Sequence, residues 1–236
     1  MKRLGFAVLI LFSVNNFAQN VYLNDAQVWL KLSVQKKLSD RFSVELKNQD
    51  RFANNVSEFT RMKADLGFIF KLNQHIRLRA DYVFIEKRKL SGAYSPRHRY
   101  YFAITAKKDI MRWRFSYRNL FQSQYIEPFT SEDGYIPYYY DRNKITVQYE
   151  YNKYLSFYVA EELYLPLNNP QVKGFDRSRT FVGLLYKLGK RQQLEAFFLY
   201  QAELQNDRDW FNQRNTYPDY TLARDFVYGL GYSYSF

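Results

Sequence analysis

The sequence DFVYGLGYSYSF, residues 225–236, ends the chain on a nearly strict alternation of two kinds of side chain. The large apolar and aromatic members are Phe226, Tyr228, Leu230, Tyr232, Tyr234 and Phe236. The residues between them are mostly small or polar. Because successive side chains of a β-strand point to opposite sides, the segment predicts a strand with an aromatic face and a small, mostly polar face. Such a strand fits between a core and water, or between lipid and a lumen.

The terminal aromatic residue favours lipid and a lumen. Phe236 ends the sequence, Tyr234 lies two residues before it, and Gly231 lies three residues before that. This spacing resembles the closing strand of Gram-negative outer-membrane β-barrels. We therefore predict that Gly231, Tyr234 and Phe236 form a signal that the barrel assembly machinery reads. Gly229 departs from the usual signal, in which a polar residue stands at this position.

The first residues have the organisation of a secretory signal peptide. Two basic residues precede an apolar run from Leu4 to Val14, and Asn16-Phe17-Ala18 is suited to cleavage. The run is too short for a membrane-spanning helix, which needs roughly 20 apolar residues. We expect residues 1–18 to be a cleaved signal peptide and residues 19–236 to form a single outer-membrane barrel domain.

Composition points in the same direction. The chain has 23 Tyr and 21 Phe, more than a core of this size needs, and outer-membrane barrels place such residues in aromatic girdles at both membrane interfaces. An aromatic-rich soluble sandwich or sugar-binding module is the alternative. The absence of Cys excludes disulfides, thiolate chemistry and a lipoprotein anchor. With only two His, we predict neither a metal site nor a cofactor.

Period-two alternation recurs along the chain, and helical spacing fits none of the alternating segments. The clean segments are 28–35, 42–51, 61–72, 76–84, 97–107, 112–118 and 144–150, and the less regular ones are 154–164, 178–188 and 192–203. Short connections (36–40, 73–75, 107–110, 152–153, 189–191) alternate with long ones (53–58, 86–96, 122–141, 165–177, 204–222). This pattern predicts an all-β, antiparallel up-and-down transmembrane β-barrel of 10–12 strands. Because single-chain bacterial barrels have even strand numbers, we favour twelve, with Val21–Leu23 as a short first strand.

The predicted luminal face is strongly charged and mostly basic. The formal charge of +12 becomes 12 − 2 = +10 without Lys2 and Arg3. The predicted lumen charge cluster consists of Glu45, Arg61, Asp65, Arg79, Asp81, Arg99, Arg114, Arg118, Glu150, Glu162 and Glu195. In a narrow barrel these charges can pair and fill the lumen. Alternatively, the basic excess forms a constriction that binds or passes small anionic solutes. We expect no nucleic-acid partner, because the chain is exported and carries no nucleic-acid-binding motif.

We assign no catalytic residues. A lipid hydrolase at the barrel rim needs a nucleophile, a base and an orienting polar group. Ser95 and His98 are the candidates. His98 is assigned to the outward face, and so is Ser95 if the strand extends through Pro96, but no orienting acid lies near them in the sequence. The segments 122–141 and 204–222 combine acidic and aromatic residues that suit sugar stacking or Ca²⁺ binding, without an ordered ligand spacing.

The chain after its signal resembles a family of small outer-membrane proteins known only as a domain of unknown function. Trp29-Leu30-Lys31-Leu32, Arg51, Arg61 and Phe236 carry the resemblance, which implies an outer-membrane barrel and brings no catalytic residues. We expect a monomer in contact with outer-membrane lipid and lipopolysaccharide. The first candidate function is a narrow, porin-like channel or binding site for small anions. The alternatives are a non-conducting structural or loop-presenting barrel and, third, the rim lipid hydrolase.

Overall fold

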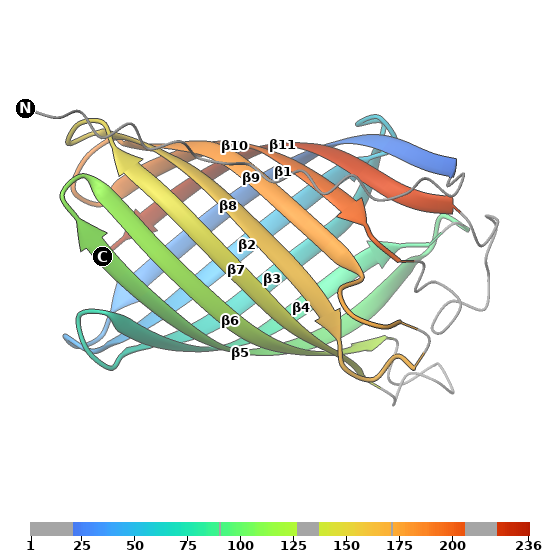
Figure 1. Ribbon diagram of the computed structural model, residues 1–236, viewed down its shortest axis with the longest axis horizontal. Coiled ribbons are helices and arrows are strands. Elements are labelled where there is room, and N and C mark those ends of the chain that lie inside the picture. Colours follow the sequence, from blue (N-terminus) through green and yellow to red (C-terminus); the bar gives the residue numbers. More distant parts are fainter. Residues whose placement is uncertain (1–20, 90, 127–136, 171, 206–220) are drawn as a thin grey trace, which may run out of the picture.

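The computed structural model describes residues 21–89, 91–126, 137–170, 172–205 and 221–236. Within these residues, eleven strands close into a barrel (Figure 1). The strands are β1 (Val21–Lys37), β2 (Phe42–Ala53), β3 (Glu58–Lys71), β4 (Ile76–Arg88), β5 (Tyr94–Ile110), β6 (Trp113–Ile126), β7 (Tyr138–Glu150), β8 (Leu155–Pro166), β9 (Arg177–Lys187), β10 (Gln192–Glu203) and β11 (Thr221–Ser235). The described residues contain no helix long and apolar enough to cross a membrane. The predicted signal peptide lies outside the described residues.

Strands that follow one another in the chain pair antiparallel, and the barrel closes through a parallel ladder between β1 and β11. This ladder, which we call the seam, ends near the pair Gln35 and Ser235. The preference for twelve strands was wrong, because Val21–Leu23 is the beginning of β1 and not a separate strand. In an up-and-down barrel an odd strand number makes the first and last strands run in the same direction. Their pairing is therefore parallel.

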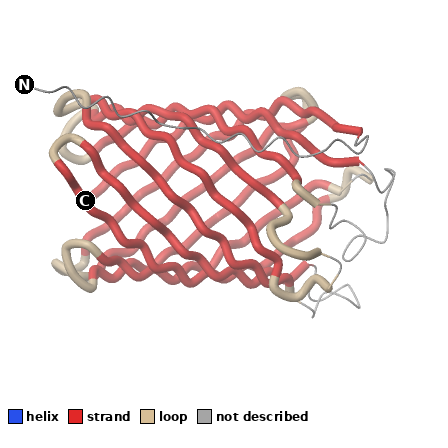
Figure 2. Tube along the Cα trace, viewed as in Figure 1, coloured by secondary structure: helices blue, strands red, loops and turns tan. Residues whose placement is uncertain are grey.

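The two ends of the barrel differ in their connections (Figure 2). At the turn end, strands are joined by residues 38–41, 72–75, 111–112, 151–154 and 188–191. At the loop end, the connections are 54–57, 89–93, 127–137, 167–176 and 204–220, of which 127–136 and 206–220 lie outside the described residues. The connection 54–57 lies within one residue of the predicted loop 53–58 at each end. The connection 89–93 is shorter than the predicted loop 86–96, because β4 and β5 extend further towards the loop end. The turn predicted at 107–110 lies at 111–112, which places Arg112 in a turn and not on the luminal face.

Side chains at the turn end explain why the chain reverses there. Asn73 Oδ1 accepts hydrogen bonds from the backbone N–H groups of His75 and Ile76, both at 2.8 Å. Asn152 Oδ1 accepts the equivalent bonds from Tyr154 and Leu155, also at 2.8 Å. A short side-chain oxygen that captures backbone donors two and three residues further on favours a tight turn.

The outer surface of the barrel is apolar along its strands. Large hydrophobic side chains that remain exposed there include Leu46, Phe68, Leu78, Phe102, Ile104, Phe115, Ile145, Val159, Val182, Leu194, Tyr228 and Leu230. They alternate with inward residues, as the sequence predicts for a two-sided wall. The buried side chains that pack together lie inside the barrel, so the lumen holds the core.

Candidate functional site: the lumen

One side of the lumen is packed with apolar side chains. This apolar wall is formed by β8 to β11 and β1, which are contiguous through the seam, and consists of Trp29, Tyr158, Ala160, Phe181, Phe197, Leu199 and Val227. Leu199 and Val227 are 0% exposed. Two glycines make room for the rings: Gly229 lies opposite Phe197, and Gly183 lies opposite Tyr158. A Cβ atom at Gly229 would lie 1.9 Å from the Phe197 ring. This side of the barrel is therefore filled.

Two lysines border the apolar wall and cover its aromatic rings. Lys31 Nζ lies 3.9 Å from the centre of the Phe197 ring, and Lys144 Nζ lies 3.8 Å from that of Phe181. Lys31 also forms an ion pair of 3.3 Å with Glu195, which accepts a hydrogen bond from the Tyr158 hydroxyl. A cation over an aromatic face is attracted by the negative centre of the ring. The two lysines are therefore held in place by their contacts with the apolar wall.

The opposite side, the polar wall on β2 to β7, begins near the turn end with a neutralised group of charges. We call this group the turn-side cluster: Glu45, Lys47, Asp65, Arg79 and Asp81. Arg79 bridges Glu45 at 2.5 Å and Asp81 at 2.6 Å, while Lys47 pairs with Asp65 at 2.9 Å. Three carboxylates therefore meet two cations in this cluster, which leaves no positive excess.

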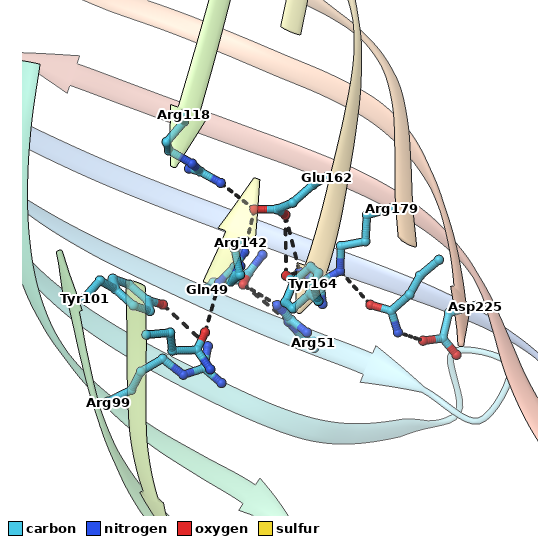
Figure 3. A network of polar contacts seen from close by, with 12 residues as sticks. Gln49, Arg51, Arg99, Tyr101, Arg118, Arg142, Glu162, Tyr164, Arg179 and Asp225 are labelled. Carbon is cyan, nitrogen blue, oxygen red and sulfur yellow. Dashed lines mark hydrogen bonds and ion pairs between the residues drawn. The ribbon is translucent and has the colours of Figure 1, made fainter. Parts of the chain in front are cut away.

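At mid-height a single carboxylate holds several cations (Figure 3). Glu162 of β8 is 1% exposed and pairs with Arg118 of β6 at 2.6 Å and with Arg142 of β7 at 2.9 Å. Arg179 of β9 lies 3.9 Å from the same carboxylate, and the Tyr164 hydroxyl donates a hydrogen bond of 3.4 Å to it. This central cluster spans the contiguous strands β6 to β9 and so joins the two walls where β7 and β8 pair. Its arginines outnumber its carboxylate, so it is positively charged as a whole.

A cavity of about 290 Å³ lies along the polar wall between the turn-side and central clusters. Its lining residues are Lys47, Asp65, Ile69, Arg77, Arg79, Asp81, Tyr101, Ala103, Thr105, Arg118, Leu120 and Arg142. Several buried polar atoms around it, among them Asp65 Oδ1, Arg118 Nε and Arg142 Nε, have no hydrogen-bond partner within the described residues. Such atoms can form hydrogen bonds with a small polar ligand or with water.

Towards the loop end, the polar wall carries cations in register. Arg51 of β2 pairs directly with Arg61 of β3, which pairs directly with Lys87 of β4, which pairs directly with Ser95 of β5. We call these four residues the loop-side row. Lys63, Arg97 and Arg99 lie near it on β3 and β5. On the loop side of Asp65 and Asp81, Glu58 is the one described carboxylate of β2 to β6 that faces the lumen, and it pairs with Arg88 at the rim.

Carboxylates do line the far wall near the loop end. Asp25 and Asp225 occupy paired positions across the seam, and Glu203 lies on β10. Asp225 accepts a hydrogen bond from Gln201, which in turn accepts one of 2.7 Å from Arg179. The loop-side lumen therefore has a basic wall facing a smaller acidic group.

The structure resolves the predicted lumen charge cluster into separate groups. Glu45, Asp65, Arg79 and Asp81 lie in the turn-side cluster, and Arg118 and Glu162 lie in the central cluster. Glu195 lies against the apolar wall, and Arg61 and Arg99 lie on the loop side. Arg114 and Glu150, 3.9 Å apart, lie near the turn end, where Arg114 also pairs with Asp109.

The assignment of Ser95 and His98 to the same face was wrong. Ser95 points into the barrel and is 1% exposed. His98 points outwards, where its Nδ1 atom lies 2.8 Å from the Tyr82 hydroxyl oxygen. Residues three apart in a strand lie on opposite faces, so the two side chains are separated by the barrel wall. They form no catalytic pair.

The predicted assembly signal lies at the end of β11. The rings of Tyr234 and Phe236 contact each other edge to face, with centroids 4.7 Å apart. Gly231 pairs with Lys31 across the seam and with Glu195 on the other side. Recognition of these residues by the assembly machinery stays a prediction.

Comparison with known proteins places this barrel in a family. The family model described as "Protein of unknown function (DUF2490)" matches residues 26–212. The chain belongs to the DUF2490 family. No match was found among curated proteins.

This DUF2490 barrel is similar to solved outer-membrane barrels. A NanC porin structure aligns over 76% of this chain and 87% of its own, with 14% identity and a TM-score of 0.48. Two structures of OmpT from Vibrio cholerae, folded in vitro or expressed in the outer membrane, align over 72% of this chain with a TM-score of 0.37 and 13% and 14% identity. The match spans 54% of the OmpT chain. At these identities the likeness concerns the fold alone.

Several functional side chains of the DUF2490 barrel were missed from its sequence. Arg142 was placed beside a long loop, but β7 begins at Tyr138 and carries it into the lumen. Arg179 could have been placed on the inner face from the alternation of β9, because Val182 and Leu184 point outwards. The inward apolar residues were missed because the luminal face was expected to be charged and mostly polar.

Proposed function

We propose that this protein is an outer-membrane β-barrel that binds small anionic solutes in a narrow lumen and conducts them along its polar wall. The observation that carries the proposal is the set of in-register cations on the loop side, which no carboxylate of the same described wall neutralises. Basic residues around a constriction favour anions over cations. Positive charge between low-dielectric walls also raises the local concentration of anions.

Membrane insertion is supported by the outer surface. Phe102 is 64% exposed, and Ile145 and Leu230 are each 60% exposed on different strands. Exposed apolar side chains on so many strands are costly in water and suit a hydrocarbon environment. In the proposed arrangement these side chains contact the hydrocarbon core of the membrane, and aromatic residues lie near its interfaces with water.

The path that we propose follows the polar wall. It leads from the loop-side row past the central cluster to the cavity of about 290 Å³ and the turn end. The apolar wall closes the rest of the cross-section, because Leu199 and Val227 have no exposed surface. The expected conductance is therefore small, as a narrow and partly filled lumen requires.

Conductance of the refolded protein in a planar bilayer under a salt gradient tests the proposal. We expect small steps with an anion-selective reversal potential. Replacing Arg61 and Arg99 with Gln should move that potential towards zero. The matched control replaces Lys153 and Lys190, exposed cations in turns at the turn end, with Gln. A cation-selective channel, or equal potentials in both double variants, would contradict the proposal.

The second candidate function is a non-conducting barrel. The burial of Leu199 and Val227, both 0% exposed, and of Glu162, 1% exposed, favours it, because such closely packed side chains leave no path through their part of the lumen. A silent bilayer, with folding shown by heat-shifted mobility on a gel, would support this candidate against the channel.

A further inference from the structure

The loop-side row places like charges next to one another without neutralising them. Arg51, Arg61 and Lys87 occupy directly paired positions on three adjacent strands. Directly opposed side chains on one face of a sheet have Cβ atoms about 5 Å apart, and like charges at such positions repel each other. A barrel that keeps this arrangement maintains a local positive field inside a narrow space.

Nearby carboxylates leave this field in place because they are engaged elsewhere. Asp65 pairs with Lys47, and Asp81 pairs with Arg79, both in the turn-side cluster. Glu203, on β10, is not on the wall that carries the row. Within the described residues, neither Arg61 nor Lys87 has a hydrogen-bond or ion-pair partner.

Arg51 is held in position before any ligand arrives. Its guanidinium group stacks 3.5 Å from the centre of the Trp29 ring and donates hydrogen bonds of 2.9 and 3.3 Å to Gln49 Oε1. A guanidinium fixed by stacking loses little freedom on binding, and its remaining N–H groups form a planar fork suited to oxyanions. Arg51 therefore offers preorganised hydrogen-bond donors at one end of the row.

Ser95 supplies an independent sign of a ligand. Its side chain ends the row on β5, is 1% exposed, and has an Oγ atom without a hydrogen-bond partner among the described residues. A buried hydroxyl without a partner is costly, and an oxyanion beside it can accept a hydrogen bond from it. The same position thus offers a neutral donor next to cationic ones.

We infer that the loop-side row, Arg51, Arg61, Lys87 and Ser95, is a binding site for a phosphate group, either free or carried by a small solute. A phosphate monoester carries a charge of about −1.5 to −2 at neutral pH and three acceptor oxygens. It matches a row of cations with one hydroxyl donor better than a monovalent ion without directional acceptors. The inference rests on the proposed function, since it names the anion that this lumen binds.

The test is calorimetric titration of the refolded, detergent-solubilised chain with inorganic phosphate and, separately, with glycerol 3-phosphate. We expect at least one of them to bind to the wild-type protein. Stronger binding of inorganic phosphate identifies a free anion, and stronger binding of the ester identifies a carried phosphate group. If neither binds, the inference is overturned.

Variants locate the site. We expect Arg61→Gln to weaken phosphate binding roughly ten-fold or more, because it removes a charged donor. Ser95→Ala should weaken it about five-fold, and it removes only a hydroxyl oxygen, so it remains informative if the arginine variant does not fold. Arg112→Gln, in a turn at the turn end, and Ser123→Ala, on β6, are the matched controls and should bind as the wild type does. Unchanged binding in Ser95→Ala and in a folded Arg61→Gln protein would overturn the inference.

The outcome is separable from that of the proposed function. Anion-selective conductance without phosphate binding would overturn this site and leave the channel. Phosphate binding that depends on the row in a barrel that does not conduct would support the site and remove the channel.

Discussion

The apolar wall and the polar wall of the lumen face each other in the same narrow space, and they are stabilised by different interactions. On the apolar wall, rings and aliphatic side chains pack as they do in the core of a soluble protein, with glycines opposite the largest rings. On the polar wall, burial is possible because charges are paired in the turn-side and central clusters. In the loop-side row, Arg61 and Lys87 have no such partner among the described residues. The difference teaches that the unpaired cations are a property of one region and not of a generally basic lumen.

Removing the carboxylate of the central cluster should have the largest effect on this contrast. Glu162→Gln leaves Arg118, Arg142 and Arg179 without their shared counter-charge, and we expect a loss of about 3–5 kcal/mol in the free energy of unfolding. Denaturant unfolding in lipid vesicles, followed by Trp fluorescence, measures it. Glu161→Gln is the control, because this neighbour points outwards and accepts its hydrogen bond from Thr180. Equal losses in both variants would show that the central cluster does not hold the walls together.

Truncation of a side chain of the apolar wall should reduce the free energy of unfolding somewhat less than Glu162→Gln does. Leu199→Ala removes a fully buried side chain and leaves a cavity, which typically costs about 2–4 kcal/mol. Leu194→Ala on the same strand is the matched control, because its side chain is exposed on the outer surface. The same unfolding measurement compares the two. If Leu194→Ala were as costly as Leu199→Ala, the apolar wall would not be the packed core of the barrel.

A finer test adds one methyl group to the apolar wall. Gly229→Ala places a Cβ atom where the Phe197 ring lies, and the overpacking should cost about 1–2 kcal/mol. Gly231→Ala, two residues further on the same face, meets Glu195 Oε2 at 3.2 Å, a flexible side chain, and should cost less. Replacing Phe197 with Leu in the Gly229→Ala background should recover part of the loss. No recovery would mean that the glycine serves the backbone and not the ring.

The strands could be predicted from the sequence because their cause is local. Alternation such as that of Phe226 to Phe236 is visible within a few residues, and the outward side chains of Phe102 and Ile145 follow the same parity. The strand number could not be settled locally, because it depends on whether the first and last strands meet in the same direction. An empirical preference for even numbers outweighed the count of eleven segments.

The candidate site was predicted only in part, for a related reason. Parity placed Arg61 and Arg99 on the inner face, but it contains no information on which neighbours lie in register across strands. The row of Arg51, Arg61 and Lys87 therefore emerges only once the pairing is known. Ser95 was misplaced because a strand that continues from His98 back through Pro96 gives Ser95 the opposite parity, and β5 does begin at Tyr94.

The parallel seam has a consequence for protein engineering. In an even-numbered barrel the first and last strands form a hairpin-like pair, so a short linker can join them and new termini can be opened elsewhere. Here the start of β1 lies at the loop end and the end of β11 lies at the turn end. A linker would have to run the length of a strand, about 50 Å at roughly 3.3 Å per residue. A circular permutation of this barrel therefore cannot use a short linker between β11 and β1.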